Sequence, residues 1–170
     1  LIVKYLNIIR HGESETPSSV KNDFLRSLSK KGKNDLETID AYLMQYNFHK
    51  HKIICSTSTR TRETLDCIKS SLNPESKIIY SHDSYLGTFK KLLKEIVVEA
   101  KNTSMLTIIG HNPGVSDLLS YLVGNYDIRD MGTSTVARLK FNNQSMDKSY
   151  ESSAKIDFYV QSKNNMIIDL

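Results

Sequence analysis

Two histidines and two arginines are the side chains of this sequence whose types and positions could do chemistry. Arg10 and His11 are adjacent and follow an apolar run. Arg60 opens a helical pattern after a second such run, and His111 follows a third. Guanidinium groups bind phosphate oxygens bidentately and stay charged at any biological pH, and a neutral imidazole can form a covalent phosphoryl intermediate. The set favours phosphoryl chemistry, with the arginines supplying the positive charge that a metal ion supplies elsewhere.

The elements that must position these residues alternate between strands and helices. Short apolar runs rich in β-branched residues predict strands at Ile2–Ile9, Lys52–Cys55, Lys77–Tyr80, Met105–Ile109, Val136–Phe141 and Ile156–Val160. Helical spacing of apolar residues predicts four helices. The first is capped by Ser29 and buries Leu36, Ile39, Leu43 and Met44, and the second, Thr59–Leu72, buries Leu65, Ile68 and Leu72. The third spans Thr88–Ala100 and has one apolar side, and the fourth buries Val115, Leu118, Leu119 and Leu122. The polar stretch Asn142–Ser153 is expected to be an exposed loop.

This alternation predicts an α/β fold, a three-layer α/β/α sandwich with a mostly parallel central sheet. Ligands of such sheets bind outside the carboxyl ends of the strands. Because His11 and His111 follow predicted strands and Arg60 lies at the start of the helix after another, we expect His11, Arg60 and His111 to meet at one crevice.

Length and composition narrow the class of protein. The 170 residues, 39% hydrophobic and 25% charged, predict one globular domain over residues 1–170. The net charge of +4 comes from scattered basic residues, whereas nucleic-acid binding favours a long basic stripe, so no nucleic-acid partner is expected. No apolar run approaches the ~20 residues of a membrane span. A cytoplasmic protein with no membrane contact is therefore expected.

Other potentially reactive residues receive structural interpretations. Cys55 and Cys67 lack metal-ligand spacing and are interpreted as reduced core thiols. His49 and His51 flank a lysine with no further ligands in view, which predicts a solvated loop.

Three segments resemble a known family. Leu6–Glu13, with the sequence LNIIRHGE, resembles the signature of the histidine phosphatase superfamily, Ser56–Thr64 resembles its second motif, and Gly110–Gly114 its third. Arg26–Gly32 and Met131–Ser134 are similar to the phosphohistidine phosphatase branch, called SixA-like. The resemblance implies a phosphoglycerate mutase-like fold.

The resemblance also implies roles for the four candidate residues. His11 would be the nucleophile, and Arg10, Arg60 and His111 would hold the phosphoryl oxygens during hydrolysis. It implies a metal-independent phosphatase without cofactor, acting as a monomer on a phosphorylated small molecule or a phosphohistidine protein.

Further residues are implied near the substrate. Gly12 would allow close backbone approach, and Arg26 would lie at the rim. Asp83 lies near the place where phosphoglycerate mutases carry a proton-donating glutamate, and the lack of a stronger acid favours phosphoramidate or otherwise activated substrates. Thr57 departs from the family pattern, because the family usually has proline at this position. Arg62 is a second candidate for the catalytic role of Arg60, but the spacing in the family favours Arg60.

Three other functions remain open from the sequence. A cysteine-dependent phosphatase would use Cys55, but four residues separate it from Arg60 and six from Arg62, and such enzymes use a spacing between these two. A phosphoglycerate mutase-like phosphotransferase would need a lid and a firm proton donor. A non-catalytic module that binds a phosphorylated partner would need no turnover at all.

Overall fold

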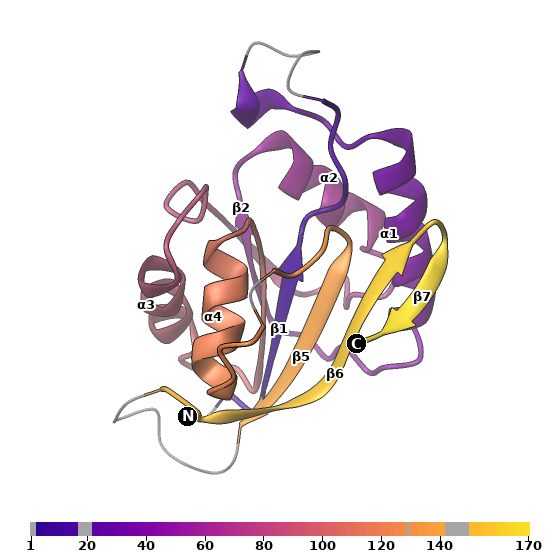
Figure 1. Cartoon of the computed structure of the whole chain (residues 1–170). Coiled ribbons are helices and arrows are strands. Elements are labelled where there is room, and N and C mark those ends of the chain that lie inside the picture. Colours follow the sequence, from indigo (N-terminus) through magenta and orange to yellow (C-terminus); the bar gives the residue numbers. More distant parts are fainter. Residues whose placement is uncertain (1–2, 17–21, 129, 142–149) are drawn as a thin grey trace.

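A computed structural model describes residues 3–16, 22–128, 130–141 and 150–170. Within these residues one sheet runs in the order β3-β2-β4-β1-β5-β6-β7 (Figure 1). Four neighbouring strands are parallel: β3 (Lys77–Ser81), β2 (Lys52–Ser56), β4 (Met105–Gly110) and β1 (Tyr5–Arg10). The antiparallel strands β5 (Thr135–Phe141), β6 (Ala154–Lys163) and β7 (Met166–Asp169) extend the sheet beyond β1.

Helices cover both faces of this sheet (Figure 1). One face packs on α1 (Lys30–Leu43) and α2 (Thr59–Cys67), and the other on α3 (Phe89–Glu99) and α4 (Gly114–Val123). Each pair encloses its own buried apolar cluster, which excludes water from both sides of the central strands. The predicted α/β sandwich with a mostly parallel sheet is confirmed.

The register of the central strands sets where the loops emerge. Arg10 at the end of β1 lies opposite Gly110 of β4 on one side and Thr135 of β5 on the other. Cys55 of β2 lies opposite Ile109 of β4. The chain therefore leaves β1, β2 and β4 at one edge of the sheet, as expected for parallel neighbours.

Several boundaries differ from the sequence-based expectation. Met44 ends α1 as its C-cap and is 64% exposed, so its predicted place on the buried face is wrong. Helix α2 ends at Cys67, and Leu72 reaches the core from the turns that follow. Strand β7 is not predicted by the apolar pattern, because its residues are half-buried or exposed. The sequence feature that indicates this strand is the pair Asn164–Asn165. These residues have φ angles of 54° and 60° and form the tight turn of the hairpin between β6 and β7.

The interpretation of His51 as a solvated loop residue is wrong, whereas His49 is exposed as expected. His51 is 3% exposed. Its Nδ1 forms a hydrogen bond of 2.6 Å with the carbonyl oxygen of His49, and its Nε2 forms one of 2.9 Å with Oγ1 of Thr107. Both ring nitrogens thus have partners, which removes the usual penalty for burying a polar group.

The remaining expectations divide between described and undescribed residues. Both cysteines are free, with Cys55 buried as predicted and Cys67 only half-buried. No helix among the described ranges is long and apolar enough to cross a membrane. The predicted strand start at Ile2, the turn over residues 17–19 and most of the predicted loop, residues 142–149, lie outside the described residues.

The first turn of α1 is packed against the loop that follows β1. Ser29 caps the helix by accepting a hydrogen bond from the Gly32 amide, and its own amide donates to the Glu13 carbonyl at 2.9 Å. A Cβ atom on Gly32 would lie 2.1 Å from the same carbonyl oxygen. Only glycine therefore allows this approach without displacing the loop.

We expect Gly32→Ala to lower the free energy of unfolding by about 1–3 kcal/mol, because the added methyl group overpacks the contact with Glu13. Urea unfolding followed by circular dichroism measures the change. Lys33→Ala, at the exposed neighbouring position, is the matched control and should leave stability within about 0.5 kcal/mol. Equal stability of the Gly32→Ala variant and the wild type would contradict the close contact.

Candidate active site

His11 lies directly after β1 with its ring fixed in one orientation. The side chain is 7% exposed, and Nδ1 lies 2.7 Å from the carbonyl oxygen of Gly12. A carbonyl only accepts hydrogen bonds, so Nδ1 carries the proton and Nε2 carries the lone pair. The Gly12 amide in turn donates to Oγ1 of Thr64 on α2 at 3.1 Å, which holds this peptide in place. Nε2 is therefore the nitrogen available for nucleophilic attack.

Arg60 at the start of α2 donates from Nε to Nε2 of His11 at 3.2 Å. Its helix is anchored by Thr61, whose hydroxyl donates to the carbonyl of Ser56 at 2.7 Å. Arg60 is 2% exposed, whereas Arg62 is exposed and its guanidinium lies 4.8 Å from the Tyr80 ring centre. The structure thus brings Arg60, and not Arg62, to His11.

Thr57, which stands where the family usually has proline, holds its loop in place through hydrogen bonds. Its amide donates to the carbonyl of Ser81 at the end of β3, at 3.2 Å, and its hydroxyl lies 3.2 Å from Nδ1 of His82. Proline has no amide hydrogen for the first of these bonds. The loop before Arg60 is therefore tied to β3 by hydrogen bonds.

His111 follows β4 and faces His11 across the site. The two ring centres are 4.9 Å apart and the rings are tilted by 57°. Nε2 of His111 lies 2.9 Å from the hydroxyl of Ser56, while Nδ1 is buried without a partner among the described residues. The first residue of the second motif thus orients the histidine of the third motif.

Arg10 reaches the same edge of the sheet with its guanidinium directed at the loop before β5. Nη1 donates to a carboxylate oxygen of Asp130 at 3.1 Å and to the carbonyl of Met131. The amide of Asn112, next to His111, donates to the same two residues. Nε of Arg10 is buried and has no partner in the described part of the chain.

Both imidazoles are held in the neutral form. Burial is the largest cause, and the neighbouring guanidinium groups add to it, lowering the pKa of His11 to about 3. Burial and the proximity of His11 and Arg60 lower the pKa of His111 to about 2. Desolvation and positive neighbours both disfavour a charged imidazole. At neutral pH the site therefore combines two uncharged histidines with charged arginines.

Asp23 connects Arg26 to this cluster. Asp23 lies on η2 (Asp23–Leu25), a single turn of 3₁₀ helix, and its carboxylate accepts hydrogen bonds from Arg26 and Arg60 at 2.9 and 3.0 Å. Tyr85 donates to the same carboxylate at 2.7 Å, and its ring meets that of His111 edge-on at 5.4 Å. Sequence reasoning missed Asp23 and Tyr85. Asp23 could have been found from its position three residues before Arg26, a spacing at which an acidic and a basic side chain can pair.

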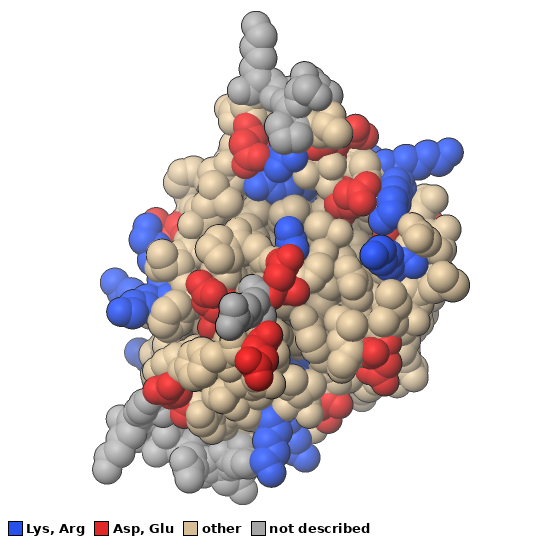
Figure 2. All heavy atoms as spheres, in the orientation of Figure 1, with Lys and Arg blue, Asp and Glu red and all other residues tan. Residues whose placement is uncertain are grey.

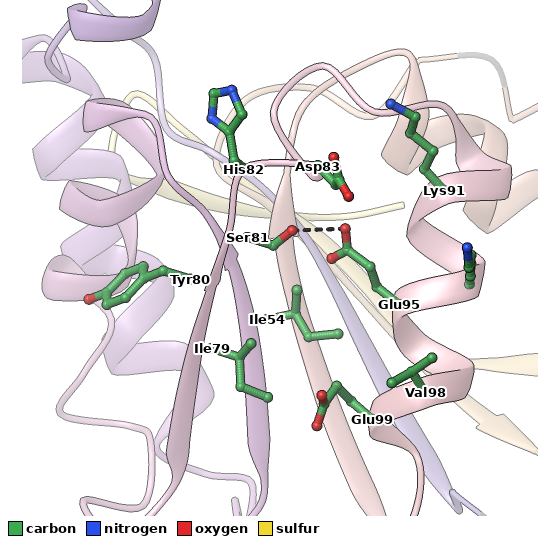
Figure 3. Close-up of a pocket in the computed structure, with 11 residues that line it drawn as sticks. Ile54, Ile79, Tyr80, Ser81, His82, Asp83, Lys91, Glu95, Val98 and Glu99 are labelled. Carbon is green, nitrogen blue, oxygen red and sulfur yellow. Dashed lines mark hydrogen bonds between the residues drawn. The ribbon is translucent and has the colours of Figure 1, made fainter.

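Asp83 lies apart from the cluster. It is exposed and lines a cavity of about 640 Å³ between β3 and α3, where Ser81 donates to Glu95 at 2.8 Å (Figure 3). No hydrogen bond joins Asp83 to His11 or His111 in the described structure. Of the predicted substrate-binding residues, the structure thus brings Gly12 and Arg26 to the cluster but not Asp83.

The described residues contain no group of three or more His, Cys, Asp or Glu side chains placed to hold a metal ion. On the face shown in Figure 2, basic and acidic side chains are interspersed and do not form a continuous basic stripe.

We expect His11 and His111 to make the protein less stable as the pH falls. Their folded-state pKa values, about 3 for His11 and about 2 for His111, lie below the value of about 6.5 in the unfolded chain. Below pH 6.5 the unfolded state therefore binds protons that the folded state excludes, at a cost of about 1.4 kcal/mol per pH unit for each histidine. Urea unfolding between pH 7.5 and 4.5 measures the slope.

His111→Asn should reduce the slope of unfolding free energy against pH by about 1.4 kcal/mol per pH unit, the contribution of one histidine. His49→Asn, which replaces an exposed ring, should leave the slope unchanged. Identical slopes for wild type and His111→Asn would contradict a buried neutral His111.

Known proteins resemble this chain in sequence and in fold. Residues 6–83 match the model of the histidine phosphatase superfamily (branch 1). An uncharacterized chloroplastic protein of Arabidopsis thaliana is 28% identical over an alignment of 132 residues, and the match covers 72% of this chain. The chain spans about 61% of the length of that relative.

Solved structures share the fold over nearly the whole chain. A protein from Nakamurella multipartitia that carries the name phosphohistidine phosphatase SixA superposes with a TM-score of 0.81 at 19% identity, covering 94% of this chain and 96% of that one. The protein histidine phosphatase SixA complexed with tungstate gives 0.76 at 17% identity, covering 93% and 96%. The phosphoglycerate mutase of Plasmodium falciparum gives 0.64 at 13% identity, covering 98% and 97%, which confirms the mutase-like fold. The chain is therefore similar to the histidine phosphatase superfamily in its sequence over residues 6–83, which include the first two motifs, and it shares the fold of these solved structures over nearly its whole length.

Proposed function

We propose that this protein is a metal-independent phosphatase that hydrolyses phosphohistidine or a phosphate monoester through a covalent phosphohistidine on His11. One observation carries the proposal: Nδ1 of His11 donates to the Gly12 carbonyl, which leaves the Nε2 lone pair facing Arg60, beside His111. Residues 1–170 are proposed to form one histidine phosphatase domain.

In the first step, Nε2 of His11 attacks the phosphorus atom. A nitrogen–phosphorus bond forms while the bond to the leaving group breaks, and the leaving group takes the bonding electron pair. The lowered pKa of His11 keeps Nε2 unprotonated without a separate base. Arg10 and Arg60 would stabilise the charge on the equatorial oxygens, and the unpartnered Nδ1 of His111 would bind a further oxygen.

In the second step, water attacks the phosphorus atom and the nitrogen–phosphorus bond breaks. Inorganic phosphate leaves, and His11 recovers its lone pair. The Gly12 carbonyl supports both steps, because it stabilises the ring while Nε2 is phosphorylated and positive charge spreads to Nδ1–H.

The acids near the cluster bear on the class of substrate. Burial raises the pKa of Asp23, but the hydrogen bond from Tyr85 and the charge of Arg60 outweigh it and lower the pKa to about 2. Asp23 is therefore ionised at neutral pH and has no proton to give. An imidazole leaving group departs with less protonation than an alkoxide, so this arrangement favours phosphohistidine or activated esters. The solved relative named protein histidine phosphatase supports a phosphohistidine protein as partner.

We expect His11→Ala to reduce hydrolysis of p-nitrophenyl phosphate and of a phosphohistidine peptide by at least about a thousandfold, because the nucleophile is lost. The wild type should form an acid-labile, base-stable phosphoenzyme, trapped by rapid quenching, that the variant lacks. EDTA should leave the wild-type rate unchanged. Full turnover by His11→Ala, or loss of activity in EDTA with recovery in Mg²⁺, would overturn the mechanism. Transfer of the phosphoryl group from the enzyme to an added sugar, rather than to water, would establish a mutase.

Cys55→Ser should retain nearly full activity on both substrates. Cys55 is fully buried, and burial raises the pKa of its thiol to about 12, so it holds no reactive thiolate at neutral pH. The rate is compared with wild type at equal folded concentration, set by near-UV circular dichroism. Loss of the phosphoenzyme in a folded Cys55→Ser variant would revive the cysteine-dependent alternative.

A further inference from the structure

The carboxylate of Asp23 occupies the cationic side of the proposed phosphoryl site. Oδ2 accepts from Nη2 of Arg60 at 3.0 Å and from the hydroxyl of Tyr85 at 2.7 Å. Oδ1 accepts a hydrogen bond from Nε of Arg26 at 2.9 Å and forms an ion pair with Nη2 of the same side chain at 2.8 Å. The main-chain carbonyl of Asp23 also accepts from Nη1 of Arg60 at 2.7 Å. A single acidic residue thus takes hydrogen bonds from both arginines on this side.

These bonds use the donors that a phosphoryl group needs. Nη1 and Nη2 of Arg60 are held by Asp23, and Nε is held by the nucleophilic nitrogen of His11. Three of the five N–H groups of this guanidinium are therefore engaged, and a bidentate phosphate contact through Nη1 and Nη2, or through Nε and Nη2, competes with these bonds. The bonds to Asp23 therefore hold Arg60 against the lone pair that must attack.

Asp23 is placed so that an incoming anion can displace it. Its side chain is 47% exposed, whereas that of Arg60 is 3% exposed. Helix η2 is one turn long and contains no buried residue, so moving it uncovers no core. A phosphoryl dianion also carries more charge than a carboxylate, which favours exchange at a buried guanidinium.

Resting on the function proposed above, we propose that Asp23 is an internal counter-anion that the substrate's phosphoryl group displaces from Arg60 and Arg26. Asp23 weakens the binding of phosphoryl ligands and, by returning to the arginines, promotes the release of inorganic phosphate. It thereby determines which anions the site retains: an oxyanion with two charges competes well with the carboxylate, and one with a single charge competes poorly.

The test measures binding of inorganic phosphate by isothermal titration calorimetry to wild type, Asp23→Asn and Asp66→Asn. Asp23→Asn keeps the side-chain shape but removes the charge, and should lower the Kd for phosphate about tenfold, since a charge-assisted hydrogen bond no longer competes. Asp66 is exposed on α2, the helix that carries Arg60, so Asp66→Asn removes the same charge nearby and should leave the Kd within about twofold.

Tyr85→Phe provides a second route to the same result. It deletes the hydroxyl that holds Asp23 but keeps the charge and the ring, and should lower the Kd about fivefold, outside the twofold range expected for Asp66→Asn. This variant decides the question if Asp23→Asn fails to fold in a thermal melt.

The direction of the change separates this role from a structural one. If Asp23 merely positioned the arginines, its neutral variant would bind phosphate more weakly, and an unchanged or raised Kd in folded Asp23→Asn overturns the proposal. Arg60→Ala distinguishes the two levels of inference. If wild type does not bind phosphate, or binds it equally without Arg60, the proposed function fails. If binding requires Arg60 but is not tightened by Asp23→Asn, only the role of Asp23 fails.

Discussion

Placing two imidazoles among three guanidinium groups is the constraint on which the rest of the site depends. Positive neighbours and burial both oppose protonation of His11 and His111, so the rings remain neutral where exposed histidines would begin to titrate. The Gly12 carbonyl then selects the tautomer, since it can only accept a hydrogen bond. Neutrality and tautomer together leave a lone pair on Nε2 of His11, as the proposed mechanism requires.

The fold supplies the positions that this arrangement needs. The parallel strands β1, β4 and β2 are neighbours, so residues a hundred positions apart emerge at one edge of the sheet. Contacts between loops then fix the side chains. Ser56 orients His111, Thr64 holds the peptide of Gly12, and the glycine at position 32 lets α1 approach the loop after His11. These contacts come from α1, α2 and β2, which is how a rigid scaffold positions a site made of loops.

Charge balance is the second consequence of gathering arginines in one place. Arg60 and Arg26 share the carboxylate of Asp23, and Arg10 pairs with Asp130 on the other side of the site. Both carboxylates are far more exposed than the guanidinium groups they contact. These guanidinium groups are therefore paired with carboxylates that are more exposed to solvent than they are, and under the proposed function a phosphoryl group would take the place of the Asp23 carboxylate without leaving Arg60 unpaired.

The sequence by itself determined the alternation of strands and helices, the placement of His11 and His111 directly after two parallel strands, and the placement of Arg60 at the start of the helix that follows a third. Those features follow from local periodicity and from the geometry of parallel sheets, which need no knowledge of loop paths. Tertiary structure decided the contacts that join distant segments: Asp23 and Tyr85 at the arginines, Asp83 in a separate cavity, and His51 in the core. The physical reason is that such contacts depend on strand register and loop conformation, so a side chain's partners cannot be inferred from its immediate neighbours in the chain.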